Sequence, residues 1–376
     1  MPFPAPRSAY IHVPFCVHRC GYCNFALIAG RGDLVEPFLE AIALELSWLE
    51  QPREVDTLYF GGGTPTFLPP TQLEQLCQLV LQWHPLASDY EWTVEANPAD
   101  LDQDRLSILA NFGVNRVSIG AQSFQSGKLH LLERDHDGAD IQRSVQLARS
   151  AGMNVSLDLM FASPGETRAD WIADLEAAIS LEPDHASTYG LTFEQGTTFW
   201  NRLHKQELLA APEELEREMY LTAIERLQAA GFTHYEISNF AKPGQQSRHN
   251  HRYWAGEGYY AAGPGAARYV DGVRETNHRS TTTYLQRVAG GDSPVAQREQ
   301  LDDEQRARER LIFGLRRMAG VNRHQFAAQT GFEIDPLAGK SIAKFVALGL
   351  LVDDGECLRL SREGLLISDN LWPELL

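Results

Sequence analysis

Short runs of apolar residues alternate with longer amphipathic segments over the first two thirds of the chain. Six short runs have the length and composition of buried strands: 9–13, 55–60, 91–96, 116–119, 154–161 and 185–191. Apolar residues recur at helical spacing over the segments between them: 34–49, 71–83, 102–111, 139–151 and 168–181. Strands separated by helices pair in parallel, so the pattern predicts an α/β fold with an open doubly wound sheet or a full or partial barrel.

Polar residues and glycines stand at the ends of several predicted strands. A glycine-rich run at 61–66 follows the second strand, Asn97 follows the third and Gln122 follows the fourth. Asp158 lies in the fifth strand, ahead of a turn at 163–167. Because the carboxyl ends of parallel strands share one edge of a sheet, these positions predict a single site at that edge.

The regular alternation stops after residue 195. A helix is predicted over 212–230, a strand over 232–240 and a loop-like stretch over 241–280, where glycine is frequent. Helical patterns at 302–318, 323–330 and 342–348, then a hairpin at 353–355, have the order of a small winged-helix-like domain. We therefore predict a first domain over 1–240, a connecting segment over 241–294 and a C-terminal domain over 295–376.

The charge balance excludes several classes of function. The chain has 33 Lys+Arg against 50 Asp+Glu, a formal charge of −17, which repels phosphate backbones. Arginines in 302–318 alternate with glutamates, so we expect no nucleic-acid partner. No run approaches the ~18 apolar residues of a transmembrane helix, and the first residues lack the plan of a secretory signal. We expect a cytoplasmic protein.

Three of the five cysteines gather directly after the first strand, with the spacing CxxxCxxC: Cys16, Cys20 and Cys23. An odd number of cysteines argues against a disulfide framework. Structural zinc would need a fourth ligand, such as His12 or His18. Alternatively, three thiolates hold three irons of a four-iron cluster and leave the fourth iron open. Cys77 and Cys357 stand alone, and we expect both in the hydrophobic core.

The cysteine motif and the glycine run together resemble the radical S-adenosylmethionine (SAM) superfamily. The shared features are CxxxCxYC at 16–23 and GGGTP at 61–65. This resemblance implies a partial (β/α)6 barrel, in agreement with the six predicted strands, and a [4Fe-4S] cluster on the three cysteines. It also implies that SAM chelates the open iron and that the reduced cluster can cleave SAM to a 5′-deoxyadenosyl radical.

Several residues at the strand ends suit a SAM ligand chemically. Gly62 and Gly63 let the backbone approach the SAM amino group, although such a run can also be a simple turn. Glu95 can accept hydrogen bonds from an ammonium group or from ribose hydroxyls. Candidates for the ribose and carboxylate are Gln122, Arg134 and Asp158. Arg134 alternatively is an ordinary surface charge between two acidic residues.

Over nearly its whole length the chain resembles one branch of the superfamily, which contains oxygen-independent coproporphyrinogen III oxidases and the HemW haem chaperones. The matching stretches are 10–16, 61–66, 95–98, 120–124 and 158–167. By position, the resemblance implies SAM contacts at Tyr10, Gly62, Gly63, Thr64, Glu95, Gln122, Arg134 and Asp158, with Tyr22 and Thr192 as further candidates. In the oxidases, some of these residues hold a second SAM molecule.

Three features favour the chaperone group within this branch. The oxidases have another cysteine two residues after the third, where this chain has Phe25, and a long segment before the first strand, where nine residues precede Tyr10. The stretch HNHRYW at 249–254 matches the HNxxYW motif of the chaperone group. The resemblance thus implies a haem chaperone that passes haem to an acceptor haemoprotein, without coproporphyrinogen oxidase activity.

The HNxxYW stretch offers two candidate haem ligands. Imidazole is a common axial ligand of haem iron, so the resemblance favours His249, with His251 as a competitor. Without the resemblance, His249 would cap a loop that Tyr253 and Trp254 anchor to the core. We further expect a membrane-bound respiratory haemoprotein as acceptor, and a homodimer. Two other functions stay open: a radical SAM coproporphyrinogen III oxidase, and a zinc-stabilised nucleic-acid factor.

Overall fold

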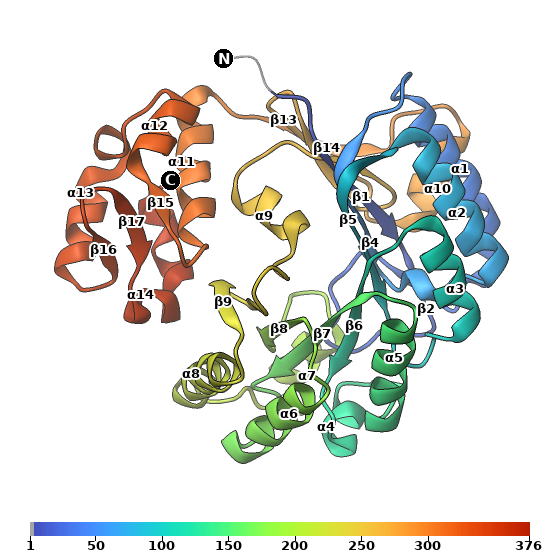
Figure 1. Cartoon of the computed structure of the whole chain (residues 1–376), viewed down its shortest axis with the longest axis horizontal. Helices are drawn as coiled ribbons and strands as arrows, with labels where there is room; N and C mark the ends of the chain where they lie inside the picture. The colour runs from blue at the N-terminus through green and yellow to red at the C-terminus, as the bar shows by residue number, and fades with distance from the viewer. Residues whose placement is uncertain (1–3) are drawn as a thin grey trace.

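A nine-stranded sheet forms the centre of the larger part of the molecule (Figure 1). The computed structural model describes residues 4–376. Six strands lie side by side in chain order and pair in parallel: β1 (Ser8–Val13), β4 (Val55–Gly62), β5 (Leu86–Ala96), β6 (Arg116–Gln122), β7 (Asn154–Phe161) and β8 (His185–Gly190). These are the six strands expected from the sequence. The predicted α/β fold with a parallel sheet is therefore confirmed.

Three short strands extend this sheet at its two edges. β11 (Tyr260–Ala262) pairs in parallel with β1, while β10 (Asn239–Ala241) pairs antiparallel with β8 and with β9 (Thr233–Glu236). Among residues 4–376 the two outermost strands, β11 and β9, do not pair with each other. The sheet is therefore an open barrel. The single strand expected over 232–240 is instead a tight hairpin.

Helices connect the parallel strands and cover the outside of the sheet (Figure 1). They are α1 (Val35–Ser47), α2 (Pro70–Trp83), α3 (Gln103–Phe112), α4 (Ser126–Leu131), α5 (Gly138–Ser150) and α6 (Arg168–Ser180). Local sequence sets several helix ends. Asp137 and Thr167 form capping boxes at the starts of α5 and α6, and Gly113 ends α3 with a φ of 96°. One large hydrophobic core lies between helices and sheet.

The connecting region is more ordered than its sequence suggests. After α7 (Thr198–His204) and α8 (Glu213–Ala229), the stretch 241–280 contains α9 (Arg248–Trp254), β11, β12 (Ala267–Val270) and β13 (Val273–Asn277). The prediction of a loop over 241–280 is therefore wrong. Its glycines lie in the turns between short elements, as Gly272 does between β12 and β13. α10 (Thr281–Ala289) and β14 (Val295–Gln300) follow, and β14 completes a three-stranded antiparallel sheet with β13 and β12.

The C-terminal part has its own hydrophobic core and lies to one side of the barrel, at the left of Figure 1. It contains α11 (Asp303–Leu315), β15 (Val321–Asn322), α12 (Arg323–Thr330), α13 (Ile334–Ala347), β16 (Leu351–Asp353), β17 (Cys357–Leu360) and α14 (Arg362–Leu366). Three helices followed by a hairpin give the expected winged-helix-like order. The third helix begins eight residues earlier than its apolar pattern indicated.

Short elements complete the chain. β2 (Phe15–Cys16) and β3 (Ile28–Ala29) form a small parallel pair that brackets the cysteine motif. 3-10 helices lie at Gly32–Leu34, Pro65–Phe67, Ser368–Asn370 and Trp372–Glu374. Over residues 4–376, no helix has the length and hydrophobicity needed to cross a membrane.

Candidate functional site

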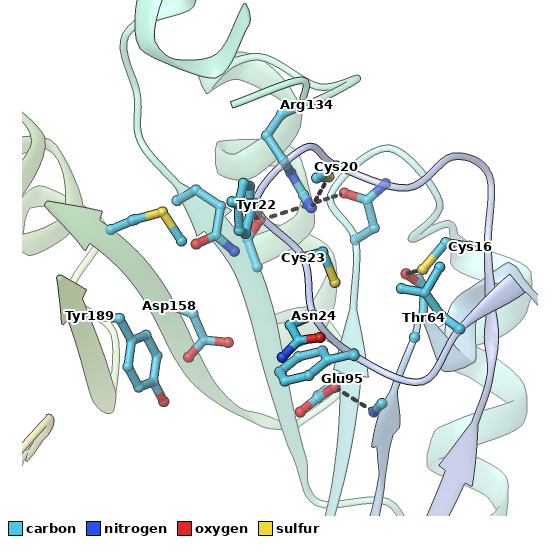
Figure 2. Close-up of a pocket in the computed structure, with 18 of the residues that line it drawn as sticks. Cys16, Cys20, Tyr22, Cys23, Asn24, Thr64, Glu95, Arg134, Asp158 and Tyr189 are labelled. Carbon is cyan, nitrogen blue, oxygen red and sulfur yellow. Dashed lines mark hydrogen bonds between the residues drawn. The ribbon is translucent and has the colours of Figure 1, made fainter. Parts of the chain in front are cut away.

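A cavity of about 710 Å³ opens at the carboxyl ends of the parallel strands, beneath the cysteine loop (Figure 2). Most of the site residues expected from the sequence line it: Cys16, Cys20, Tyr22, Cys23, Gly62, Gly63, Thr64, Glu95, Gln122, Arg134, Asp158 and Thr192. They lie in β2, β4, β5, β6 and β7 or in the segments that follow these strands and β8. The structure therefore places these residues at one site, as the strand-end pattern predicted.

The cysteine loop runs between β2 and β3 and is held by its own backbone and by one arginine. The Cys23 amide donates to the Cys20 carbonyl at 3.0 Å, which forms a turn within the motif. The Arg19 guanidinium donates to the carbonyls of Cys23 and Phe25, both at 3.3 Å, and to that of Leu27 at 2.6 Å. These bonds fix the path of the loop over the cavity.

The three thiols border the cavity in different surroundings. Cys16 Sγ lies 3.4 Å from Thr64 Oγ1, and Arg134 donates to Cys20 Sγ at 3.6 Å. Burial raises the pKa of the Cys16 thiol to about 12 and also raises the pKa of Cys23. Over residues 4–376, no three Cys, His, Asp or Glu side chains are gathered as a metal-ligand set. The three thiols thus face one cavity, and in the described part of the chain they are not drawn around a single point.

The glycine run brings bare backbone to the cavity wall. A Cβ on Gly63 would lie 2.6 Å from the Phe15 carbonyl oxygen and 2.8 Å from that of Val13. Gly62 has a φ of 105°, and a Cβ there would lie 2.4 Å from the His12 ring. Only glycine fits both positions, because any side chain would collide with β1 or with the chain that follows it.

Two carboxylates face the cavity from neighbouring parts of the sheet. Glu95 accepts hydrogen bonds from the Gly62 amide at 3.0 Å and from the Tyr59 hydroxyl at 2.8 Å. Asp158 accepts from Ser118 Oγ at 3.0 Å. Burial raises the pKa of Glu95 to about 7 and also raises the pKa of Asp158, and the nearby Asp158 carboxylate adds to the cost of ionising Glu95. A cationic ligand in the cavity would stabilise both ionised forms.

Arg134 is not a surface charge. Its guanidinium donates to the Asn97 side-chain oxygen at 2.7 Å and to the Gly120 carbonyl at 3.1 Å, in addition to Cys20 (Figure 2). Gln122 beside it has a φ of 61°, a left-handed conformation that is rare for a residue with a side chain. Gln122 and the Gly120 carbonyl that Arg134 contacts both lie at the end of β6, where the strand pairing with β7 becomes irregular.

Tyr10 lies outside the cavity lining, unlike the other SAM-contact candidates on the sheet. Its hydroxyl is 3.1 Å from His12 Nδ1, and its ring stacks on Tyr59 with centroids 5.9 Å apart. Tyr59 in turn donates to Glu95. Tyr59 therefore separates Tyr10 from Glu95, which lines the cavity.

His249 also lies away from the cavity, in a closed environment. Its Nδ1 is 3.0 Å from Thr57 Oγ1, its Nε2 is 3.0 Å from the Tyr253 hydroxyl, and the side chain is buried. Burial lowers the pKa of His249 to about 3. Both ring nitrogens thus have partners in this structure, which differs from the open imidazole expected of an axial ligand. His251 is half-buried, and over residues 4–376 its ring bonds only to Gln246, through Nε2 at 3.0 Å.

The HNxxYW stretch forms α9, which joins the sheet to the C-terminal domain. At its start, the buried Glu91 of β5 accepts from the amides of Arg248 and His249, both at 3.0 Å. At its end, the Arg316 guanidinium of the C-terminal domain lies over the Trp254 ring, with Cζ 4.7 Å from the ring centroid. This arrangement agrees with the anchoring role that the residues alone suggested for Trp254.

Comparison with known proteins assigns this chain to a family. Residues 10–178 match the radical SAM superfamily, and residues 301–367 match the HemN C-terminal domain. "Heme chaperone HemW" of Bacillus subtilis (strain 168) is 36% identical, over 98% of this chain and 99% of the relative. That of Lactococcus lactis subsp. lactis (strain IL1403) is 33% identical, over 99% and 97%. The chain belongs to the HemW family.

A solved structure supports the fold of this HemW family member. Coproporphyrinogen III oxidase (HemN) from Escherichia coli, described as a radical SAM enzyme, superposes with a TM-score of 0.87 at 22% identity, covering 99% of this chain and 90% of that one. The partial barrel with its C-terminal domain is therefore confirmed. Membership of the radical SAM superfamily implies a [4Fe-4S] cluster and SAM.

Sequence reasoning missed two residues that shape this HemW site, Tyr59 and Ser118, which hold Glu95 and Asp158. Asn97, which accepts from Arg134, was already among the polar positions expected at the strand ends. Tyr59 stands two residues before Gly61, which opens the glycine-rich run, and Ser118 stands two before Gly120, which opens a stretch that matches the family, so each shares a sheet face with a motif position. The period-two alternation of strand faces would have found them.

Proposed function

We propose that the protein is a haem chaperone that carries a [4Fe-4S] cluster and SAM, and hands haem to an acceptor haemoprotein. The observation that carries the proposal is the single cavity bordered by Cys16, Cys20 and Cys23 on one side and by Glu95 and Asp158 on the other. Relatives named as haem chaperones, matched over almost their full length, support the haem part.

The donor set fits the cluster and SAM. Thiolates are the usual ligands of iron–sulfur clusters, and the positive charge of iron offsets the burial that keeps Cys16 and Cys23 protonated. Cluster binding would require the loop over 17–27 to draw the three thiols together. A cluster with one open iron supplies an attachment point for SAM and an electron for its reductive cleavage.

The cavity wall offers complementary partners for each part of SAM. The bare backbone at Gly62 and Gly63 and the Glu95 carboxylate suit an ammonium group. Arg134 suits a carboxylate, because its guanidinium donates to a thiol and to two carbonyl-type oxygens, none of which carries a full charge. Asp158 and Gln122 suit ribose hydroxyls. Thr64 acts through Cys16, to which it lies within hydrogen-bond distance.

For the haem iron, we propose His251 ahead of His249. Ligation by His249 would break hydrogen bonds to Thr57 and Tyr253 and would open a buried ring, whereas within residues 4–376 the His251 ring bonds only to Gln246. Haem uptake should therefore produce a Soret band that His251→Ala shifts or removes. If His249→Ala shifts the Soret band and His251→Ala does not, the preference for His251 over His249 is wrong.

The experiment that tests the function is a titration of the anaerobically reconstituted protein with haem, paired with an assay of coproporphyrinogen III in the presence of SAM and reductant. We expect about one haem per chain and no conversion of coproporphyrinogen III, in keeping with Phe25 at the position of the oxidases' additional cysteine. Turnover to protoporphyrinogen IX would establish the oxidase instead. The acceptor, the homodimer and the cytoplasmic location stay predictions.

A further inference from the structure

The cysteine loop carries an arginine within its own motif. Arg19 stands directly before Cys20 in the sequence. Its guanidinium turns back and donates to the carbonyls of Cys23, Phe25 and Leu27. One of these partners, at 3.3 Å, is the backbone of a candidate cluster ligand, Cys23. The positive charge of Arg19 is therefore held against the loop that supplies the thiols.

A second arginine reaches the same loop from the start of α10. Arg279 donates to the backbone oxygen of Asn24 and, at 3.4 Å, to its side-chain oxygen. Asn24 follows Cys23 and lines the cavity (Figure 2). Both arginines also line a depression of about 340 Å³ that is formed with loop residues 24–28. Two guanidinium groups from distant parts of the chain thus gather at the second half of the cysteine loop.

Neither guanidinium is neutralised by a carboxylate. Over residues 4–376, Arg19 and Arg279 bond to amide-type oxygens, and no Asp or Glu forms an ion pair with either of them. Just beyond the loop, Arg31 shows the contrasting arrangement, because it pairs with Asp33 at 2.6 Å. The charges of Arg19 and Arg279 therefore act on the surroundings of the loop without a counter-charge beside them.

A [4Fe-4S] cluster on the three cysteines would lie within reach of these charges. Uptake of one electron makes such a cluster more negative by one charge, so nearby positive charge stabilises its reduced form. Two carboxyl groups that line the same cavity, Glu95 and Asp158, act in the opposite sense when ionised. The two arginines thus offset the acidic wall of the cavity.

We propose that Arg19 and Arg279 raise the reduction potential of the cluster by placing two positive charges against the loop that holds it. The proposal rests on the cluster-binding part of the proposed function and is independent of haem. Neither arginine has to contact iron or SAM, since the interaction between charges extends over several ångströms. With these charges in place, the cluster accepts an electron from a weaker reductant than the acidic cavity alone would allow.

The test is a redox titration of the anaerobically reconstituted protein, followed by electron paramagnetic resonance of the reduced cluster. Dithionite supplies the single electron that each cluster takes up. Arg19→Gln and Arg279→Gln should each lower the ratio of reduced to oxidised cluster about threefold at a fixed potential, because both charges are exposed and partly screened. For a one-electron couple this is a shift of about 28 mV, and the double variant should shift by about 59 mV.

Conservative variants separate the charge from the hydrogen bonds. Arg19→Lys and Arg279→Lys lose the fork of donors and keep the charge, so they should retain the potential of the wild type. If they shift it as far as the Gln variants do, the charge proposal is wrong. Arg287→Gln is the matched control, because it removes a positive charge farther along α10 and outside the depression. It should leave the potential unchanged.

A further variant keeps the test decisive if the loop does not tolerate Arg19→Gln. Thr282, exposed in the first turn of α10, lines the same depression as Arg279. Thr282→Glu leaves every arginine contact in place, and an acidic residue is favourable in a first helical turn. It should lower the potential in the same direction as Arg279→Gln. An unchanged potential in both variants would overturn the proposal.

Iron and sulfide analysis distinguishes failure of this proposal from failure of the proposed function. If the wild type assembles a four-iron cluster whose potential the Gln variants do not lower, the electrostatic role is wrong and the cluster-binding function stands. If the wild type assembles no such cluster, both are overturned.

Discussion

Each cysteine has a distinct place in the molecule. Cys16, Cys20 and Cys23 border the cavity, whereas Cys77 is fully buried on the inner face of α2, as expected from its sequence context. Cys357, also expected in the core, is instead half-buried in β17, where Asn322 donates toward its sulfur at 3.8 Å. That expectation was wrong because β17 is a hairpin strand with one face toward solvent.

These positions predict which substitutions remove the cluster. Replacing Cys16, Cys20 or Cys23 by Ala should abolish cluster binding, because a cubane held by two thiolates loses a ligand it cannot replace. Iron and sulfide analysis after anaerobic reconstitution would measure this. Cys357→Ala is the matched control and should retain about four irons per chain. Iron content that survives loss of a loop cysteine would refute the ligand assignment.

Glu95 makes stability depend on pH. Its folded pKa of about 7 lies above the ordinary value of 4.5, so the folded protein retains a proton that the unfolded chain releases. The free energy of unfolding should therefore fall as pH rises from about 4.5 to about 7, by up to about 3 kcal/mol from this group. Glu95→Gln should flatten that slope in urea unfolding measured at several pH values.

The matched control for this slope is Glu36→Gln, on the exposed side of α1, which should leave it unchanged. Other buried carboxyls, such as Glu236 with a pKa raised to about 7, contribute in the same direction, so the comparison concerns the difference between proteins. Parallel curves for the wild type and Glu95→Gln would show that Glu95 does not titrate in this range.

At the scale of elements, the glycine turn after β4 gives the sharpest expectation. Gly63→Ala should destabilise the protein by about 2 kcal/mol or more, because its Cβ would press on the backbone carbonyls of Phe15 and Val13. Gly127→Ala in α4 is the control, since nothing lies within 4 Å of the added Cβ and alanine favours helix. Equal unfolding free energies for the two variants would contradict the close approach.

The pattern of apolar residues was sufficient for the regular elements and insufficient for the short ones. Strand 154–161 was predicted at its observed bounds, since a long β-rich run needs no tertiary information. α2 begins at Pro70 after Pro69, without the side-chain cap that helps other helices. The stretch 241–280 could not be predicted, because α9 and β11 gain their stability from Glu91 and β1, which lie far away in sequence.

The same limit applies to the candidate site. Motifs placed Glu95, Arg134 and the cysteines correctly at one cavity, because strand ends converge in any parallel sheet. The position of His249 could not be read from the sequence. Its burial depends on Thr57 from the amino-terminal half of β4, a contact that exists only once the barrel forms.

At the scale of the whole molecule, α9 bridges the barrel and the C-terminal domain. The Trp254 ring contacts both Phe313 of α11 and Arg316, the residue that follows this helix. The centroids of the Trp254 and Phe313 rings lie 6.2 Å apart. Trp254→Ala should cost about 2 kcal/mol and should speed amide hydrogen exchange in α11. Trp48→Ala, at a residue 41% exposed on the barrel surface, should change neither. Unaltered exchange in α11 would mean that the domain is held elsewhere.

The pairing of β1 with β11 has a consequence for synthesis. Ala9 pairs with Tyr260, so the earliest strand to leave the ribosome waits for most of the chain before its second edge is filled. Until then its amides and carbonyls offer a template to any neighbouring strand. A nascent chain stalled near residue 255 should therefore associate with its copies on a polysome, whereas one released after β11 has emerged should not.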